Sequence, residues 1–151
     1  MKLDVIIRRG VVESLGSRSA TPARILYDSI SMSDGQRVSW VGVSDAMDHK
    51  LNAAVKAGKE VELHVVKAPG AEHAGLVAMR EAGGQLFAES VAIPAGFKIA
   101  PLLIGLFGVV TIPFFGVGLI LIFIAWRLSK KLAPLKAIAS YAAGLPGAVR
   151  V

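Results

Sequence analysis

The chain has 151 residues, a hydrophobic fraction of 54%, no cysteine and a formal net charge of +6. Without cysteine it can form no disulfide, no thiolate metal site and no cysteine nucleophile. The charge is uneven, because residues 1–98 carry 12 Lys and Arg and all 11 Asp and Glu, whereas the part after Trp126 is only basic. The first part is therefore almost neutral and lacks the basic footprint of nucleic-acid-binding domains.

The N-terminal segment does not resemble an export signal. Its apolar run, residues 5–7, is too short for the core of a signal peptide and is followed at once by two arginines. We therefore expect residues 1–98 to stay in the cytoplasm. Residues 5–7 and 11–12 predict one bent strand or two short ones, with Gly10 as a bulge.

A β-hairpin is predicted next. Two runs with alternating, strand-forming character, residues 24–32 and 36–43, flank the dipeptide Asp34-Gly35. These two residue types tolerate the positive φ angles of a tight turn, so the pattern is a strong hairpin signal.

Residues 45–57 predict a helix. Ser44 can cap its free N–H groups, and Asp45 and Asp48 lie in the first turn, where the helix dipole favours negative charge. Gly58 suits a left-handed C-cap. The apolar residues recur at i, i+4, i+7 and i+8 and so share one face: Met47, Leu51, Ala54 and Val55.

More strands follow the helix. Residues 60–67 alternate strictly, so Val61, Leu63 and Val65 are expected to face a core and Glu60, Glu62 and His64 the solvent. Residues 75–80 and 85–90 predict another pair, joined around Gly83-Gly84. Several strands with one helix between the third and the fourth predict an α+β fold, with a small β-barrel of the oligonucleotide-binding (OB) type; an SH3-like barrel or an open sandwich fits nearly as well.

The stretch 99–126 has 28 residues and no charged side chain, and it predicts a membrane segment. As one helix it would rise about 42 Å, more than a hydrocarbon core of about 30 Å. A transmembrane helical hairpin with legs 95–112 and 114–131 instead keeps both flanks on the cytoplasmic side of an inner membrane. A single kinked span and a buried soluble hairpin are the alternatives.

The hairpin prediction assigns roles to individual residues. A turn near 111–118 has backbone groups that lipid cannot satisfy, which favours self-association. The residues expected at the turn and the assembly surface are Gly105, Gly108, Pro113, Phe114, Phe115, Gly116 and Gly118. The residues expected to meet lipid headgroups are Arg127, Lys130, Lys131 and Lys136.

The predicted organisation has three parts. Residues 1–93 form a cytoplasmic β-rich domain, residues 94–132 the helical hairpin, and residues 133–151 a basic C-terminal tail. The end of this tail is expected to be loose because it contains Gly144, Pro146 and Gly147.

No catalytic, cofactor or metal site is predicted. The three histidines, His49, His64 and His73, match no ligand spacing of a helix or strand. Base stacking would need exposed aromatic side chains beside arginines, as Tyr27, Trp40 and Phe87 beside Arg24, Arg37 and Arg80 would provide. In a small barrel such aromatic residues more often belong to the core, so nucleic acid is a disfavoured partner.

These features together predict a membrane-anchored, non-enzymatic protein whose partners are the lipid bilayer and other copies of itself. It would be a self-assembling interaction or scaffold module, or an accessory subunit of a larger membrane complex. The alternatives are an oligomeric channel or pore and a membrane-tethered nucleic-acid-binding barrel.

Overall fold

The structure is a computed structural model that describes residues 3–22, 24–90, 95–111 and 117–151. It divides the chain into two compact units. One unit contains the chain up to Ser90 together with Ser140–Val151, and the other consists mainly of residues 91–139. The predicted boundaries differ from this division, because the last 12 residues fold with the first domain.

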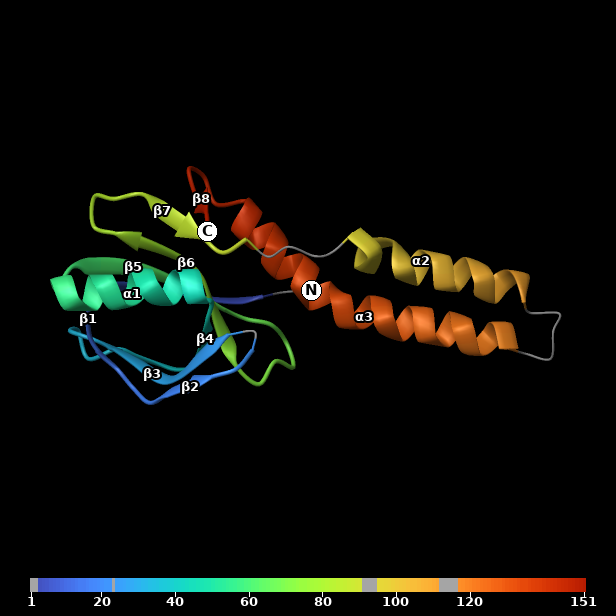
Figure 1. Cartoon of the computed structure of the whole chain (residues 1–151), viewed down its shortest axis with the longest axis horizontal. Coiled ribbons are helices and arrows are strands. Elements are labelled where there is room, and N and C mark those ends of the chain that lie inside the picture. The colour runs from blue at the N-terminus through green and yellow to red at the C-terminus, as the bar shows by residue number, and fades with distance from the viewer. Residues whose placement is uncertain (1–2, 23, 91–94, 112–116) are drawn as a thin grey trace. The chain divides into compact units, whose positions relative to one another are not determined.

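The first unit is built on a closed five-stranded β-barrel, so the predicted α+β fold with a barrel is confirmed (Figure 1). Around the barrel, β1 pairs with β3, β3 with β4, β4 with β6, β6 with β5 and β5 with β1. Only the pairing of β4 with β6 is parallel in this ring. The five strands are β1 (Asp4–Leu15), β3 (Ile25–Met32), β4 (Arg37–Val43), β5 (Glu60–Lys67) and β6 (Ala74–Glu81).

Strand β1 closes the barrel because it is shared between two neighbours. Residues 4–11 pair with β5, and the residues from Val12 onward pair with β3, with a register shift between Val12 and Ser14. A single bent strand is therefore confirmed. The expected bulge at Gly10 is wrong, since Gly10 pairs with Val61 in an uninterrupted ladder.

The predicted hairpin and helix are both confirmed. Strands β3 and β4 meet at the Asp34-Gly35 turn, where Gly35 has φ +78° and the Asp34 carboxylate accepts a hydrogen bond from the Gln36 N–H at 2.9 Å. Helix α1 spans Asp45–Ala57 and ends at Gly58 in the left-handed conformation. The expected cap by the Ser44 hydroxyl is wrong: this hydroxyl is buried and has no hydrogen-bond partner among the residues that the structure describes. The Ser44 carbonyl accepts the Asp48 N–H.

The core of this unit combines buried side chains of all five barrel strands with the buried face of α1. Met47 and Leu51 on α1 are fully buried, as are Val41, Leu63 and Leu76 on the strands. Truncation of one such side chain to alanine typically costs about 2–5 kcal/mol.

The C-terminal segment extends the sheet beyond the barrel. Strand β8 (Val149–Arg150) pairs in parallel with β7 (Leu86–Ala88), which itself pairs with β6. The Val151 N–H donates to the Ala88 carbonyl at 3.0 Å. The expectation that the last residues are loose is therefore wrong, because the free edge of β7 satisfies their backbone groups. A further short strand, β2 (Arg18–Ala20), pairs with β3.

The second unit contains two antiparallel helices, α2 (Ala95–Val110) and α3 (Val117–Ala143) (Figure 1). Helix α3 is longer than the predicted second leg and continues through Pro134; its last turn, from Ser140, belongs to the barrel unit. Four of the residues expected at the turn, Pro113, Phe114, Phe115 and Gly116, lie outside the described residues.

The lengths and charges of these helices differ from those of the predicted transmembrane legs. Helix α2 has 16 residues and so rises about 24 Å, and α3 carries Arg127, Lys130 and Lys131 in its second half. Among the described residues, no helix combines the length and the apolarity needed to cross a membrane. The transmembrane part of the fold prediction thus has no support in these helices.

Candidate functional site

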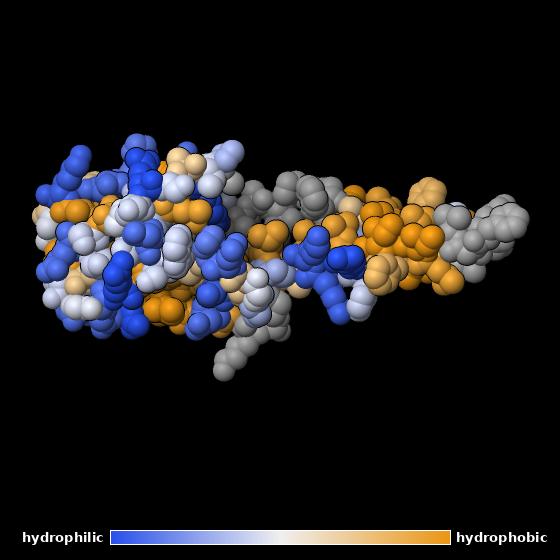
Figure 2. Space-filling model, turned by 90° about the horizontal axis from the view of Figure 1, so that it is seen from below, coloured by the Kyte–Doolittle hydropathy of each residue, from blue (hydrophilic) through white to orange (hydrophobic). Residues whose placement is uncertain are grey.

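The helical unit exposes a large apolar surface. Figure 2 shows hydrophobic residues gathered over these helices, whereas the visible face of the barrel is mixed with hydrophilic residues. Leu102, Phe107 and Leu119 are 73%, 67% and 63% exposed. The other large apolar side chains exposed on α2 and on α3 up to Trp126 are Ile99, Leu103, Leu106, Val109, Val110, Ile120, Phe123, Ile124 and Trp126.

Small residues allow the backbones of α2 and α3 to approach closely. An added Cβ on Gly108 would lie 2.8 Å from the Ile122 side chain and 2.9 Å from the Gly118 carbonyl, so the two backbones nearly touch there. An added Cβ on Gly105 would make an ordinary contact with Ala125 at 3.8 Å. Three of the residues assigned to assembly, Gly105, Gly108 and Gly118, thus lie at the contact between the two helices.

Basic side chains follow the apolar part of α3. Arg127, Lys130, Lys131 and Lys136 are all exposed, and the sequence has no acidic residue after Glu89. The Lys130 ammonium lies 3.7 Å from the centroid of the Trp126 ring. A tryptophan next to a lysine at the end of an apolar helix segment is typical of the membrane–water interface.

An open groove of about 670 Å³ runs between the two helices. Its α2 side is apolar, and its α3 side changes from apolar to polar toward the C-terminus. The lining residues are Pro101, Leu102, Gly105, Leu106 and Val109 on α2 and Ile122, Ala125, Trp126, Ser129 and Lys136 on α3. The groove was not predicted, because the side chains that line it come from two segments about 20 residues apart.

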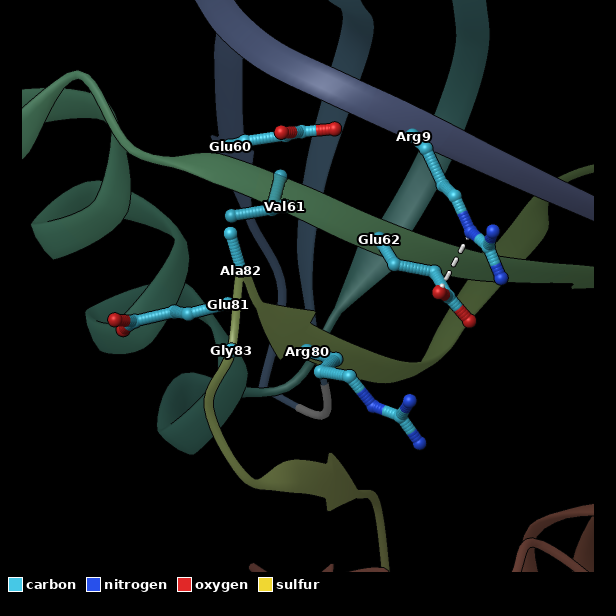
Figure 3. Close-up of a pocket in the computed structure, with 8 residues that line it drawn as sticks. All are labelled: Arg9, Glu60, Val61, Glu62, Arg80, Glu81, Ala82 and Gly83. Atoms are coloured by element: carbon cyan, nitrogen blue, oxygen red, sulfur yellow. Dashed lines mark hydrogen bonds and ion pairs between the residues drawn. The ribbon is translucent and has the colours of Figure 1, made fainter.

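The barrel has a smaller pocket of about 270 Å³ near the turn between β6 and β7 (Figure 3). Arg9, Glu62 and Arg80 lie side by side on β1, β5 and β6, and the Arg9 Nε donates to the Glu62 carboxylate at 2.7 Å. Glu60 and Glu81 also line the pocket. Acidic and basic groups alternate here, so the pocket has no strong preference for an anion or a cation.

A series of hydrogen bonds connects Glu62 to the buried side chain of His64 and to Tyr141. His64 is only 5% exposed, so the expectation that it faces solvent is wrong. Its Nε2 lies 2.7 Å from the Glu62 carboxylate, and its Nδ1 lies 2.8 Å from the Tyr141 hydroxyl. Burial raises the pKa of Glu62, but the hydrogen bonds from His64 and Arg9 outweigh it and hold this pKa below its usual value.

The aromatic residues considered for base stacking do not form one surface. Tyr27 is buried, and its hydroxyl donates to Asp48 at 2.5 Å. Phe87 lies under the Lys50 ammonium. Trp40 is exposed, has φ +55° and stacks on His73 with ring centroids 5.7 Å apart.

One of the arginines considered with them is already paired. The Arg24 guanidinium donates two hydrogen bonds to Glu89, at 2.9 and 3.1 Å. Burial raises the pKa of Glu89, and the charge of Arg24 only partly opposes this rise. Arg24 therefore stabilises a partly buried carboxylate of its own chain.

The described residues contain no group of three or more His, Cys, Asp or Glu side chains placed to hold a metal ion. Comparisons of the chain with protein families, with curated proteins and with solved structures gave no match. The apolar surface and the adjoining cations of the helical unit are therefore the features from which a function can be argued.

Proposed function

We propose that α2 and α3 insert into an anionic membrane as a helical hairpin that enters and leaves through the same face. The hairpin would anchor the barrel as a non-enzymatic interaction module, which assembles with other copies or with a larger membrane complex. The observation that carries this proposal is the exposed apolar surface of the two helices, which ends at Trp126 and the cations that follow.

The free energy gained by removing the exposed apolar side chains from water supports insertion. Full burial of one large apolar side chain is worth about 1.5–3 kcal/mol, and ten such side chains are more than half exposed on the described parts of the two helices up to Trp126. Their transfer out of water is therefore worth on the order of 10 kcal/mol. A contiguous apolar surface of this kind is typical of a membrane or partner contact.

The charges support an orientation. Basic residues near a membrane segment favour the cytoplasmic side, and anionic lipids attract them. Because both ends of a hairpin lie on one side, the barrel before α2 and the cations of α3 would share the cytoplasmic face of the membrane.

For the barrel we infer the OB-type architecture rather than the SH3-like one. The ring order β1, β3, β4, β6, β5, with α1 between the third and fourth barrel strands along the chain, supports this inference. The architecture alone assigns no ligand, since such barrels have many functions.

Co-flotation with liposomes tests membrane insertion. The full chain should float with vesicles that contain phosphatidylglycerol and should stay with them after an alkaline carbonate wash. Replacing Leu106 and Phe107, two exposed residues of α2, by glutamate should release it into the wash. The matched control, with the same change in net charge, is Ser33→Glu with Gln36→Glu on the exposed β3–β4 turn, which should float like the unmodified chain. A chain that stays in solution, or a Leu106/Phe107 variant that resists the wash, would contradict the proposal.

Self-assembly needs its own measurement. Light scattering of the full chain in a mild detergent should give a mass of at least two chains. A strictly monomeric mass across detergents would remove the assembly part of the proposal and leave the anchoring part standing.

A further inference from the structure

The groove between α2 and α3 is graded from apolar to basic. Because the helices are antiparallel and Gly105 faces Ala125, the apolar residues Leu106, Val109 and Ile122 lie toward the hairpin turn. Ser129 and Lys136 lie toward its open end. A ligand that fits must therefore be apolar along most of its length and negatively charged at one end.

The open end of the groove carries basic side chains of α3, and the sequence has no acidic residue after Glu89. The Ser129 hydroxyl donates to the Trp126 carbonyl at 2.8 Å, so it is not free to donate to a ligand. Among the described residues that line the groove, Lys136 is the cation, and the ammonium of Lys130 is held over the Trp126 ring. An anion at this end would therefore be bound by Lys136, while Trp126 would separate it from the apolar part of the groove.

We propose that the groove binds one anionic phospholipid, with an acyl chain along Leu102, Leu106 and Ile122 and the phosphodiester at Lys136. This inference rests on the proposed membrane insertion and adds a specific lipid site to it. A neutral phospholipid would fill the apolar part equally well but would gain less from Lys136, because its own ammonium balances the phosphate. The site therefore selects by headgroup charge.

Quenching of Trp126 fluorescence by brominated acyl chains tests the proposal. The chain has two tryptophans, so the full chain with Trp40→Phe reports Trp126 alone. It is reconstituted into phosphatidylcholine vesicles that contain a minor fraction of either brominated phosphatidylglycerol or brominated phosphatidylcholine. Brominated phosphatidylglycerol should be enriched at Trp126 about fivefold over its bulk fraction, the effect expected for one basic residue near the lipid surface.

Two lysine variants separate the groove from the general basic surface. Lys136→Gln should abolish the enrichment, whereas Lys131→Gln, which removes an exposed charge of the same helix that does not line the groove, should retain most of it. Equal losses in both variants would show a diffuse attraction and would overturn the proposed site.

The remaining outcomes distinguish this site from the membrane proposal. Equal quenching by both brominated lipids would overturn the lipid site and leave insertion intact. Absence of quenching by either lipid, in a chain that floats and resists carbonate, would mean that protein, such as a helix of a second copy, fills the groove; this too would overturn the lipid site. A chain that neither floats nor is quenched would contradict the proposed function itself.

Discussion

At the scale of single residues, the barrel unit buries two titratable side chains, Asp48 and His64, whose burial the sequence pattern did not identify. Asp48 was predicted only as a favourable charge in the first turn of α1, yet it is 4% exposed and is bound by Tyr27 and by Arg18. His64 was predicted on a solvated strand face, but Tyr141, 77 residues later, covers it. Alternation along a strand shows which side chains share a face, but it cannot show what a distant segment places there.

The Glu62 carboxylate should make the stability of the barrel depend on pH. Its pKa is lower in the folded chain than the usual value of 4.5. The unfolded state therefore binds more protons in this window, and the stabilisation from the carboxylate is lost as the pH falls through the folded-state pKa. Below about pH 4.5 the free energy of unfolding should fall more steeply for the unmodified chain than for Glu62→Gln.

Urea unfolding followed by circular dichroism at a series of pH values measures these slopes. Glu60→Gln, on an exposed residue of the same strand, is the matched control and should keep the slope of the unmodified chain. Parallel slopes for Glu62→Gln and the unmodified chain would show that the interactions with His64 and Arg9 do not stabilise the charged form.

Tyr27→Phe should destabilise the barrel by about 1–3 kcal/mol, because it removes a hydrogen bond to a buried carboxylate. The hydroxyl of Tyr27 also accepts a hydrogen bond from Asn52 at 3.4 Å, so the buried Asp48 carboxylate and the partly buried Asn52 amide each lose a partner. Asp45→Asn, an exposed position in the first turn of α1, should change stability by no more than about 0.5 kcal/mol. Chemical denaturation compares the two, and a Tyr27→Phe variant as stable as the unmodified chain would contradict the role given to the hydroxyl.

At the scale of elements, the segments with local signals were predicted well. Asp34-Gly35 forms the predicted turn of the β3–β4 hairpin, with Gly35 at positive φ. Gly58 ends α1 at the predicted C-cap. Strand β8 was missed because its partner β7 lies about 60 residues earlier, and Gly and Pro around it are also typical of a loose end. The groove between α2 and α3 was missed for the same reason, since contacts between distant segments have no signature in the local sequence.

The contact between α2 and α3 should depend on Gly108 far more than on Gly105. Gly108→Ala places a Cβ within 3 Å of Ile122 and of the Gly118 backbone, so the helices must separate, whereas Gly105→Ala adds an ordinary contact. Overpacking of this kind typically costs about 1–3 kcal/mol. In hydrogen–deuterium exchange of the reconstituted chain, the amides of α2 should exchange faster in Gly108→Ala than in Gly105→Ala. Equal exchange in the two variants would contradict the close packing at Gly108.

At the scale of the whole molecule, the sequence predicted a β-rich domain and a following apolar helical hairpin, and the structure contains a barrel and an antiparallel helix pair. The predicted tail, residues 133–151, is divided between the two units, because residues 140–151 belong to the barrel unit. Apolarity alone could not predict where the helices begin and end, since the uncharged stretch does not coincide with either helix. The exposed side chains of α2 and α3 therefore support membrane insertion more directly than the length of the stretch does.

Cysteine accessibility tests membrane insertion most directly, and the chain is suited to it because it contains no cysteine. Leu106→Cys on α2 and Gln36→Cys on the barrel are both exposed positions in the structure. In sealed vesicles, a membrane-impermeant maleimide should label Gln36→Cys wherever the barrel faces outward, but should leave Leu106→Cys unlabelled until detergent is added. Labelling of Leu106→Cys in intact vesicles at the rate of Gln36→Cys would contradict the membrane insertion of α2.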